Sequence, residues 1–461
     1  MTKHGQVEQS GIHNVAFETT VIGQQDPWKV PLTGLRDRVS LDTGVQMHED
    51  QPTTIIAYSL NSSEYKHALQ AYLCKSGMIC SAALHGSFRC GIPCSKFETN
   101  DTSFRWGAGL TSLMPSGDGA NFLETKNSFE STGVLEEQLL SPQQTHVNNR
   151  FADVDEGRTL RKFACQAYWA VQFAAVRRAY IGFGLDEELG YLRSLSMANP
   201  WNAQGGKSGA TFLKTLDGRF VVKQITRTEL QMFLEYAPAY FEYLSKSFFH
   251  KYETVLVKVL GVYQIGSHNR VSGRRNMEQV VVMENLFHNC SITRAFDLKG
   301  STRSRYARVG GCVHNDASLD SDRGQISSEG HPVLLDENFV EFTNGRPLAL
   351  YDHAKAHFNS AVLNDTLFLS LINVVDYSIL VGMDENRHEL VVGIIDYMRQ
   401  YDVIKKMERM GKSVGMIAGQ AEPTVIQPPN YRNRFQAAME RYFMMVPDKW
   451  TLFRMQAPTG A

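Results

Sequence analysis

The chain has 461 residues, of which 43% are apolar and 21% charged, and this length fits two or three globular domains with a sizeable core. Its formal net charge of −1 excludes a strong overall attraction to nucleic acid or to an anionic membrane, so any such binding would need a local patch. No run of about 18 apolar residues occurs, so we expect no transmembrane helix. The polar residues 1–14 lack the apolar core of a secretory signal.

The cysteine content fits a reducing cytosol better than a disulfide scaffold, because seven is an odd number and the chain is long. A cluster of four cysteines with one histidine has spacings that match no paired Cys-x-x-Cys pattern, so we favour ordinary thiols over a zinc site. The chain has no RNP motif and no basic stripe interleaved with aromatic residues, so no nucleic-acid partner is expected. The residues of the cluster are Cys74, Cys80, His85, Cys90 and Cys94.

The N-terminal third shows few regular patterns. Residues 1–52 are polar and mixed in character, which favours a disordered or loosely held segment. A run rich in β-branched residues predicts a strand over 53–60, and a capping-box pattern predicts a helix over about 64–75. Residues 86–150 are rich in glycine, serine, threonine and asparagine with little periodicity, so they predict a long insert or linker.

Regular patterns resume at Arg158. Aromatic and aliphatic residues at helical spacing predict a helix over 162–180, and a second, short helix is expected over 186–196. Two strand-like runs, 210–214 and 219–225, flank an Asp-Gly turn and predict a hairpin.

The remaining chain alternates helices and strands. We expect a second insert, rich in glycine, serine and aspartate, at about 308–331, and a loop of weak periodicity at 397–424. The predicted helices cover 228–246, 352–373 and 430–446, and the predicted strands cover 255–265, 279–284, 333–335, 378–381 and 390–395, the last two as a hairpin.

The glycine-rich run 205–209 and the lysine that follows it suit phosphate binding. Small residues let backbone N–H groups approach phosphate oxygens, although a plain glycine hairpin would have the same composition. The run is not a Walker loop, because the required spacing is missing and strands follow it. Lys223 ends the second strand and can face the cleft, where kinases use such a lysine for nucleotide phosphates; a solvated lysine is the alternative. Glu229 is either its ion-pair partner or a solvated first-turn carboxylate.

Three short runs in the last third carry acids or lysines at strand ends or turns: DLKGS at 297–301, DYSILVG at 376–382 and GIIDY at 393–397. Asp376 and Asp396 each follow or precede an apolar strand, where an acid rarely occurs without a partner or a function. An acid at the end of such a strand is the usual magnesium position in kinases. For each acid alone, a structural hydrogen-bonded role is an equal alternative.

The pattern is not that of a protein kinase. His-Arg-Asp is missing before the candidate base, position 381 is valine where an asparagine would be needed, and Asp-Phe-Gly and Ala-Pro-Glu are absent. The three runs resemble instead the phosphatidylinositol phosphate kinase family, whose corresponding loops read DLKGS, DYSLL and IID; here Ile379 replaces a leucine. Six further segments resemble the phosphatidylinositol 3-phosphate 5-kinases, which form one group of this family. These segments are 193–196, 200–201, 205–209, 282–287, 333–338 and 445–451.

The resemblance implies an α+β fold with two lobes, built from antiparallel sheets with packed helices and distantly similar to protein kinases. It implies ATP and Mg²⁺ as cofactors. Asp376 would orient or deprotonate an inositol hydroxyl, Asp396 would hold Mg²⁺, and Lys223 and Lys299 would neutralise phosphate charge. The expected catalytic residues are Asp376, Lys299 and Asp396, and the expected ATP-binding residues are Gly206, Lys207, Ser208, Gly209, Lys223, Glu284 and Leu286, the last two in the segment between lobes.

A basic, membrane-facing loop is also implied. Segment 397–424 carries five basic and three acidic side chains, a net charge of +2, and each basic residue near an anionic surface contributes about 1 kcal/mol. Lys405 and Lys406 match paired lysines in the family's activation loop, and Arg303 and Arg305 could bind a phosphate already on the inositol ring. A solvated basic loop is the alternative.

The domain organisation follows from these patterns. The resemblance extends over about 158–451 and faintly over 53–75, without the FYVE, DEP and chaperonin-like regions of long family members, so the chain is expected to be a short form or a C-terminal fragment. We expect a loose segment at 1–52, an upstream region with an insert at 53–157, the N-terminal lobe at 158–290, the C-terminal lobe at 291–451 with the activation loop at 397–424, and a tail at 452–461.

The expected activity is transfer of phosphate from ATP to the inositol 5-hydroxyl of phosphatidylinositol 3-phosphate. A phosphatidylinositol 4-phosphate 5-kinase and a catalytically weak, phosphoinositide-binding scaffold are the alternatives. The resemblance implies a cytoplasmic protein that associates peripherally with endosomal or vacuolar membranes, with a phosphoinositide lipid as partner and regulatory scaffold proteins as further candidates.

Overall fold

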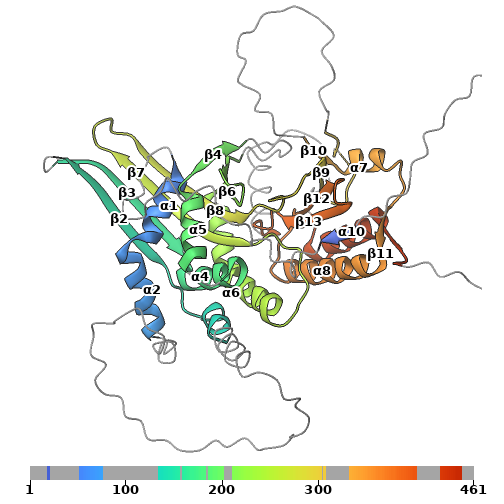
Figure 1. Ribbon diagram of the computed structural model, residues 1–461, viewed down its shortest axis with the longest axis horizontal. Helices are drawn as coiled ribbons and strands as arrows, with labels where there is room; N and C mark the ends of the chain where they lie inside the picture. Colours follow the sequence, from blue (N-terminus) through green and yellow to red (C-terminus); the bar gives the residue numbers. More distant parts are fainter. Residues whose placement is uncertain are drawn as a thin grey trace, which may run out of the picture.

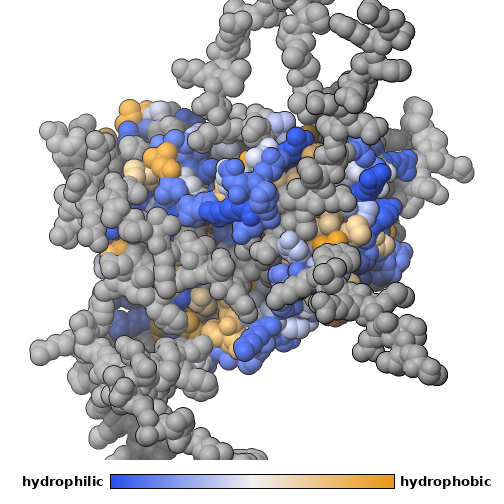
Figure 2. Space-filling model, turned by 45° about the vertical axis from the view of Figure 1, so that its right-hand side comes forward, coloured by the Kyte–Doolittle hydropathy of each residue, from blue (hydrophilic) through white to orange (hydrophobic). Residues whose placement is uncertain are grey.

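The computed structural model describes residues 18–20, 51–75, 133–155, 158–182, 185–201, 210–303, 305–307, 332–401 and 426–448. Within these residues the fold is α+β: two larger sheets lie side by side, each with its own helices (Figure 1). No helix in the described ranges is long and apolar enough to cross a membrane. On the face shown in Figure 2, hydrophilic and hydrophobic groups are interspersed.

The first sheet has seven strands, and every neighbouring pair is antiparallel. Its central strands are rich in valine and isoleucine and are buried, as expected for a sheet that is covered by helices. The strand order is β2 (Val147–Asp155), β3 (Arg158–Tyr168), β7 (Val259–Asn269), β8 (Arg275–Glu284), β6 (Phe220–Ile225), β5 (Phe212–Thr215) and β4 (Ala198–Trp201).

Helices cover this sheet and bury its aromatic core. Helix α1 contacts β3 and β7, α4 contacts β7, α5 packs on both helices, and α6 packs on α4 (Figure 1). Between them Trp169, Phe173 and Phe241 make edge-to-face contacts, a geometry that stabilises aromatic pairs beyond the area they bury. The helices are α1 (Pro52–Asn61), α2 (Ser63–Lys75), α4 (Ala170–Ile181), α5 (Leu185–Leu195) and α6 (Arg227–Phe249).

The second sheet has five strands in the order β1 (Glu18–Thr20), β13 (Glu389–Ile395), β12 (Ser378–Asp384), β9 (Arg294–Leu298) and β10 (Val333–Leu335). Its three central strands are antiparallel, whereas the edge strands β1 and β10 pair in parallel. A separate two-stranded sheet joins β11 (Leu348–Tyr351) and β14 (Phe443–Val446). The associated helices are α7 (Asp336–Phe342), α8 (Asp352–Leu371) and α10 (Pro428–Tyr442).

A short extended segment before β7 connects the two sheets. Leu256 forms a parallel bridge with Ile394 of β13, with one backbone hydrogen bond on each side, Val257 N–H to the Ile394 carbonyl at 3.0 Å and Ile394 N–H to the Val255 carbonyl at 2.7 Å. Buried residues of both sheets belong to one continuous core. The end of β13 is therefore held close to the strands of the first sheet.

Two sequence predictions are wrong because short apolar runs do not distinguish a strand from a helix. Residues 53–60 form α1, which starts with proline at its first position and packs against β3 and α5. Within 162–180 the chain forms a strand as far as Tyr168, and the helix begins only at Ala170. In β3, burial alternates with a period of two between Phe163 and Tyr168, a pattern that the helical interpretation overlooked.

The predicted insert at 86–150 ends earlier than expected, because residues 133–139 are helical and β2 begins at Val147. The predicted strand 255–265 starts at Val259, since the preceding residues pair with the other sheet. The remaining predicted elements within the described ranges are confirmed, including the hairpin β5–β6, helices α2, α5, α6 and α8, and the hairpin β12–β13. The predicted helix 430–446 is correct only as far as Tyr442, because residues 443–446 form β14, which pairs with β11. The predicted insert at 308–331 lies outside the described residues, as does nearly all of the 397–424 loop.

Candidate active site

The predicted acids and one lysine meet at a single end of the five-stranded sheet. Strand β12 pairs with both neighbours so that Ser378 faces Ile395 and Ile379 faces Leu298. At this level of the sheet β9 and β13 end and β12 begins. Asp376, Asp396 and Lys299 therefore lie at the same end of the sheet. The sequence separated these residues, and the register of three antiparallel strands brings them together.

Asp376 and Asp396 both adopt the left-handed backbone conformation, with φ of 66° and 62°. Aspartate tolerates this conformation better than most residues, because its short side chain can hydrogen-bond locally. Here the conformation turns the backbone sharply before β12 and after β13, so both carboxylates lie at the end of the sheet. Backbone strain of this kind is concentrated at functional sites.

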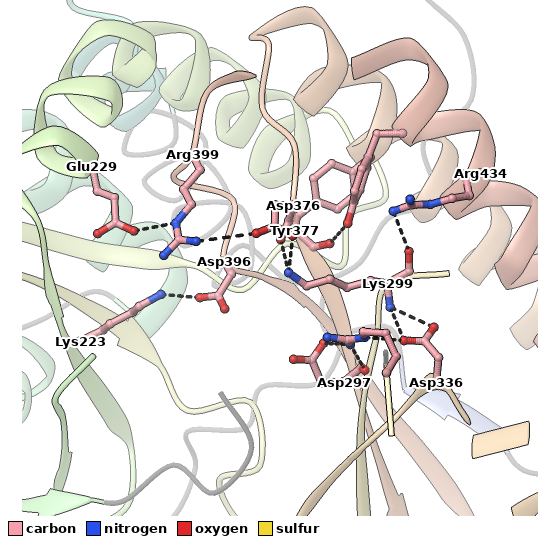
Figure 3. A network of polar contacts seen from close by, with 12 residues as sticks. Lys223, Glu229, Asp297, Lys299, Asp336, Asp376, Tyr377, Asp396, Arg399 and Arg434 are labelled. Carbon is pink, nitrogen blue, oxygen red and sulfur yellow. Dashed lines mark hydrogen bonds and ion pairs between the residues drawn. The ribbon is translucent and has the colours of Figure 1, made fainter. Parts of the chain in front are cut away.

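Lys299 forms an ion pair with Asp376. Its Nζ lies 2.6 Å from Oδ1 and 2.8 Å from the backbone carbonyl oxygen of the same residue (Figure 3). The lysine side chain is 20% exposed and the aspartate 46%. The cation is therefore largely buried, while the carboxylate that it contacts is half exposed.

Lys223 forms the second ion pair, this time between the two sheets. Its Nζ, on β6, lies 2.5 Å from Oδ1 of Asp396, with side chains 9% and 43% exposed (Figure 3). Burial by itself would raise the pKa of the Asp396 carboxyl, but the charges of Lys223, Lys299 and Arg399 outweigh it and lower that pKa. Asp396 is therefore ionised at neutral pH.

Glu229 does not pair with Lys223 as the first alternative from sequence supposed. Its Oε1 accepts the Nε–H of Arg399 at 3.0 Å, and its Oε2 accepts the backbone N–H of Thr226 at 2.9 Å. The latter bond belongs to a capping box that starts α6. Lys223 is instead held by Asp396. Burial would raise the pKa of Glu229, but the Thr226 N–H and the Arg399 guanidinium lower it.

Arg305, predicted to bind a substrate phosphate, is held inside a second charge network. Its guanidinium lies 3.0 Å from Oδ1 of Asp297 and 2.9 Å from Oδ2 of the fully buried Asp336. Asp336 also accepts the backbone N–H groups of Lys299 and Gly300 and the hydroxyl of Tyr442. This network holds the turn that carries Lys299. Phosphate binding by Arg305 would require these bonds to be given up and stays a prediction, whereas Arg303 is exposed.

The segment predicted to meet adenine has buried side chains. Glu284 ends β8, and its carboxylate accepts the backbone N–H of Lys258 at 2.6 Å and the hydroxyl of Tyr180. Burial raises the pKa of Glu284 to about 8. Leu286 packs against Val257 and Val391. Contact with a nucleotide would thus involve the backbone of this segment, and it stays a prediction.

Several predicted residues lie outside the described part of the chain. These are Gly206, Lys207, Ser208 and Gly209 of the glycine-rich run, Lys405 and Lys406 of the basic loop, and Cys80, His85, Cys90 and Cys94 of the cysteine cluster. Cys74 is exposed on α2. Among the described residues, no group of three or more His, Cys, Asp or Glu side chains is placed to hold a metal ion.

Sequence reasoning missed three residues that complete the site. Asp336 accepts the backbone N–H of Lys299 and so holds the turn that carries this lysine. Arg399 contacts both Glu229 and Asp376 (Figure 3). Arg434 on α10 has its Nη2 3.5 Å from the Lys299 carbonyl oxygen (Figure 3). Asp336 follows a strand directly, as Asp396 does, and this position was a usable signal. Nothing local to either arginine distinguishes it from a solvated one.

The arrangement is suited to phosphate chemistry. Two lysines and two half-exposed carboxylates lie together where the sheets meet, so a polyphosphate could be neutralised while a carboxylate faces a hydroxyl. In each pair the cation is the more buried partner. The carboxylates remain accessible to solvent, which favours a chemical role.

Comparison with known proteins gives a consistent result. A family model described as phosphatidylinositol-4-phosphate 5-kinase matches residues 196–390 and 384–442, together more than half of the chain. Both ion pairs lie within the matched ranges.

Curated relatives extend the similarity. A protein of Arabidopsis thaliana named 1-phosphatidylinositol-3-phosphate 5-kinase is 39% identical over 89% of this chain and 21% of its own length. Proteins of the corresponding name from Homo sapiens and Saccharomyces cerevisiae are 40% and 31% identical, over 71% and 90% of this chain and 14% and 18% of their own lengths. The chain thus spans about a fifth of these relatives or less. From the match to more than half of its length, this chain belongs to the phosphatidylinositol-4-phosphate 5-kinase family.

Proposed function

We propose that this protein transfers the γ-phosphate of ATP to the inositol 5-hydroxyl of phosphatidylinositol 3-phosphate, giving phosphatidylinositol 3,5-bisphosphate. The proposal rests on one observation above all: Lys223–Asp396 and Lys299–Asp376 lie at one junction of two sheets in a chain of this family. The choice of lipid rests on the names of the relatives, which cover this chain far more fully than it covers them.

In the proposed reaction Asp376 accepts the proton of the inositol hydroxyl. The hydroxyl oxygen forms a bond to the γ-phosphorus, the bond from that phosphorus to the bridging oxygen breaks, and ADP leaves. Lys299, next to Asp376, neutralises the transferring phosphoryl group, and Lys223 neutralises the nucleotide phosphates. Positioning and charge supply most of the rate enhancement in such transfers.

Asp396 is the proposed Mg²⁺ ligand, and its chemistry fits. It is a half-exposed carboxylate whose pKa is lowered, and Mg²⁺ in kinases is held by one or two carboxylates together with waters and substrate phosphates. When bound, the ion would supply charge neutralisation at the phosphates.

The finer architecture and location are also proposals. We propose that the seven-stranded and five-stranded sheets form the two lobes of a distantly protein-kinase-like fold, with ATP between them. The protein would act at an endosomal or vacuolar membrane surface through a local basic patch that includes Lys405 and Lys406, aided by regulatory scaffold proteins. The overall charge of −1 offers no help in that association.

The test is transfer of radiolabelled phosphate from ATP to liposomes that contain the 3-, 4- or 5-phosphate of phosphatidylinositol, each separately. Asp396→Asn is the inactive control. Label in the 3-phosphate sample that disappears in the variant supports the proposal. No transfer to any lipid by folded, ATP-binding protein would refute it.

The second candidate is a phosphatidylinositol 4-phosphate 5-kinase, because the matching family model carries that description. Label mainly in the 4-phosphate sample would establish it. Both candidates use the same charged residues, so the lipid comparison, and not the variant, separates them.

A further inference from the structure

Arg399 occupies a position that the mechanism above leaves without a role. It lies three residues after Asp396 in the sequence, and its backbone runs beside the residues that precede Asp376. Val375 donates its backbone N–H to the Arg399 carbonyl at 3.1 Å, and Val374 and Gln400 form an antiparallel bridge. The backbone of Arg399 is thus fixed directly beside the residues that lead into Asp376.

The side chain of Arg399 joins α6 to the segment that leads into β12. Its Nε lies 3.0 Å from Oε1 of Glu229 on α6, and its Nη1 lies 3.7 Å from Oδ2 of Asp376 (Figure 3). Glu229 cannot turn away easily, because its other oxygen is bound in the capping box of α6. A fixed carboxylate therefore holds the guanidinium in place.

Asp376 consequently has a different cation on each oxygen: Lys299 at Oδ1 and Arg399 at Oδ2. Two cations on opposite sides restrict rotation of a carboxylate that is otherwise 46% exposed. A planar guanidinium with several donors can satisfy both acids at once, which a lysine ammonium does less well.

We propose that Arg399 is a positioning residue. Its guanidinium is anchored by Glu229 on α6 and holds the Asp376 carboxylate where the attacking hydroxyl must meet it. Arg399 touches neither transferred phosphate nor lipid in this role. The inference rests on the proposed function, since it assigns Arg399 a part in the same transfer.

The test compares Arg399→Gln, Arg399→Lys, Glu229→Gln and the double variant Arg399→Gln/Glu229→Gln in initial-rate assays on phosphatidylinositol 3-phosphate liposomes. The contact between Nη1 of Arg399 and Oδ2 of Asp376 is an ion pair at 3.7 Å, longer than a hydrogen bond, and the loss of one such contact can change a rate by about tenfold. We expect Arg399→Gln to lower kcat about tenfold, with KM for ATP and for lipid changed less than about twofold. Arg399→Lys should recover part of kcat, and the double variant should be no slower than Arg399→Gln.

The matched control is Arg387→Gln, which makes the same chemical change on the turn between β12 and β13, where the side chain is 56% exposed. It should leave kcat and both KM values unchanged, and its Tm reports the loss of the 3.9 Å ion pair with the buried Asp384. Tm of every variant is measured as well, because a purely structural role would lower Tm and kcat together without rescue by lysine.

Three results would overturn the inference. Unchanged kcat in Arg399→Gln would remove the role, and a rise confined to KM for lipid would make Arg399 a lipid contact. A raised KM for ATP in Glu229→Gln, whether or not Arg399 is present, would mean that Glu229 acts through Lys223. An inactive wild-type protein would instead refute the proposed function itself, and the inference with it.

Discussion

The two larger sheets differ in the burial of the charged side chains near the candidate site. In the seven-stranded sheet, Lys223, Lys258 and Glu284 are all buried, and burial shifts the pKa of Lys258 down and that of Glu284 up, each to about 8. In the five-stranded sheet, Asp376 and Asp396 stand half exposed at strand ends in left-handed backbone. The first group of charges is enclosed, whereas these two carboxylates are presented to solvent; Asp336 and Asp384, near the same five-stranded sheet, are fully buried.

The difference matches two chemical tasks. A cation that always meets the same part of a nucleotide gains from a rigid, enclosed setting, because less reorganisation is needed on binding. Carboxylates that must exchange a metal ion and meet successive substrate molecules need an open side.

The open carboxylates should matter for chemistry and little for folding. We expect Asp396→Asn to lower the transfer rate roughly a thousandfold, because it removes the proposed metal ligand and the partner of Lys223. Its Tm should stay close to that of wild type. Asp352→Asn, an exposed first-turn aspartate of α8, is the matched control and should keep full activity. A large loss of Tm in Asp396→Asn would mean that its role is structural.

The enclosed network below Lys299 should behave in the opposite way. Arg305→Gln leaves the fully buried Asp336 without its cation, so we expect a loss of about 3 kcal/mol in the free energy of unfolding. The exposed Arg303→Gln should leave stability unchanged and alter only KM for lipid, if anything. Urea unfolding of both variants measures the contrast. Equal stability of the two would show that Arg305 is not a structural residue.

The turn after Lys299 should resist any side chain. Gly300 has φ of +70°, and a Cβ there would lie 2.7 Å from the Cβ of Ala438 on α10. We expect Gly300→Ala to destabilise the protein by about 2 kcal/mol, through backbone strain and the clash with the helix. Gly273→Ala, at a positive φ but with no neighbouring atom within 4 Å, separates strain from clash and should cost less.

The buried Glu284 should make stability depend on pH. Its pKa in the folded protein is about 8, above the ordinary value of 4.5. As pH rises between these values, the unfolded chain loses the proton while the folded chain keeps it, so stability falls by up to about 1.4 kcal/mol per pH unit. Lys258 does not offset this, since its opposite effect begins only near pH 8.

The measurement is the difference in Tm between Glu284→Gln and wild type at several values between pH 5 and about 8. Subtraction removes the contributions of other groups that titrate in this window. We expect the variant to gain stability relative to wild type as pH rises. A constant difference would show that Glu284 is not held in its neutral form, and would weaken the contrast between the two sheets.

Much of the site was predictable because its signals are local. Asp376, Asp396 and Lys299 stand beside apolar strands, where charged residues are rare. The hairpin of β12 and β13 follows from two short apolar runs joined by a polar turn. The strand in 162–168 and the helix in 53–60 were not predictable in the same way. Both are short runs whose period is ambiguous, and packing against α5 or β7 decides their conformation.

The amino-acid sequence by itself determined which chemical groups this protein has and at which strand ends they stand. Only the tertiary structure decided their partners. Lys223 meets Asp396 across 173 positions and Arg399 meets Glu229 across 170, because both contacts depend on how the two sheets pack. Glu229 was a plausible partner for Lys223 until packing placed it against Arg399. Packing also pairs Arg305 with Asp297 and Asp336, and its contact with a phosphate stays a prediction. Ion pairing depends on distances of a few ångströms, and no local pattern encodes such a distance between remote segments.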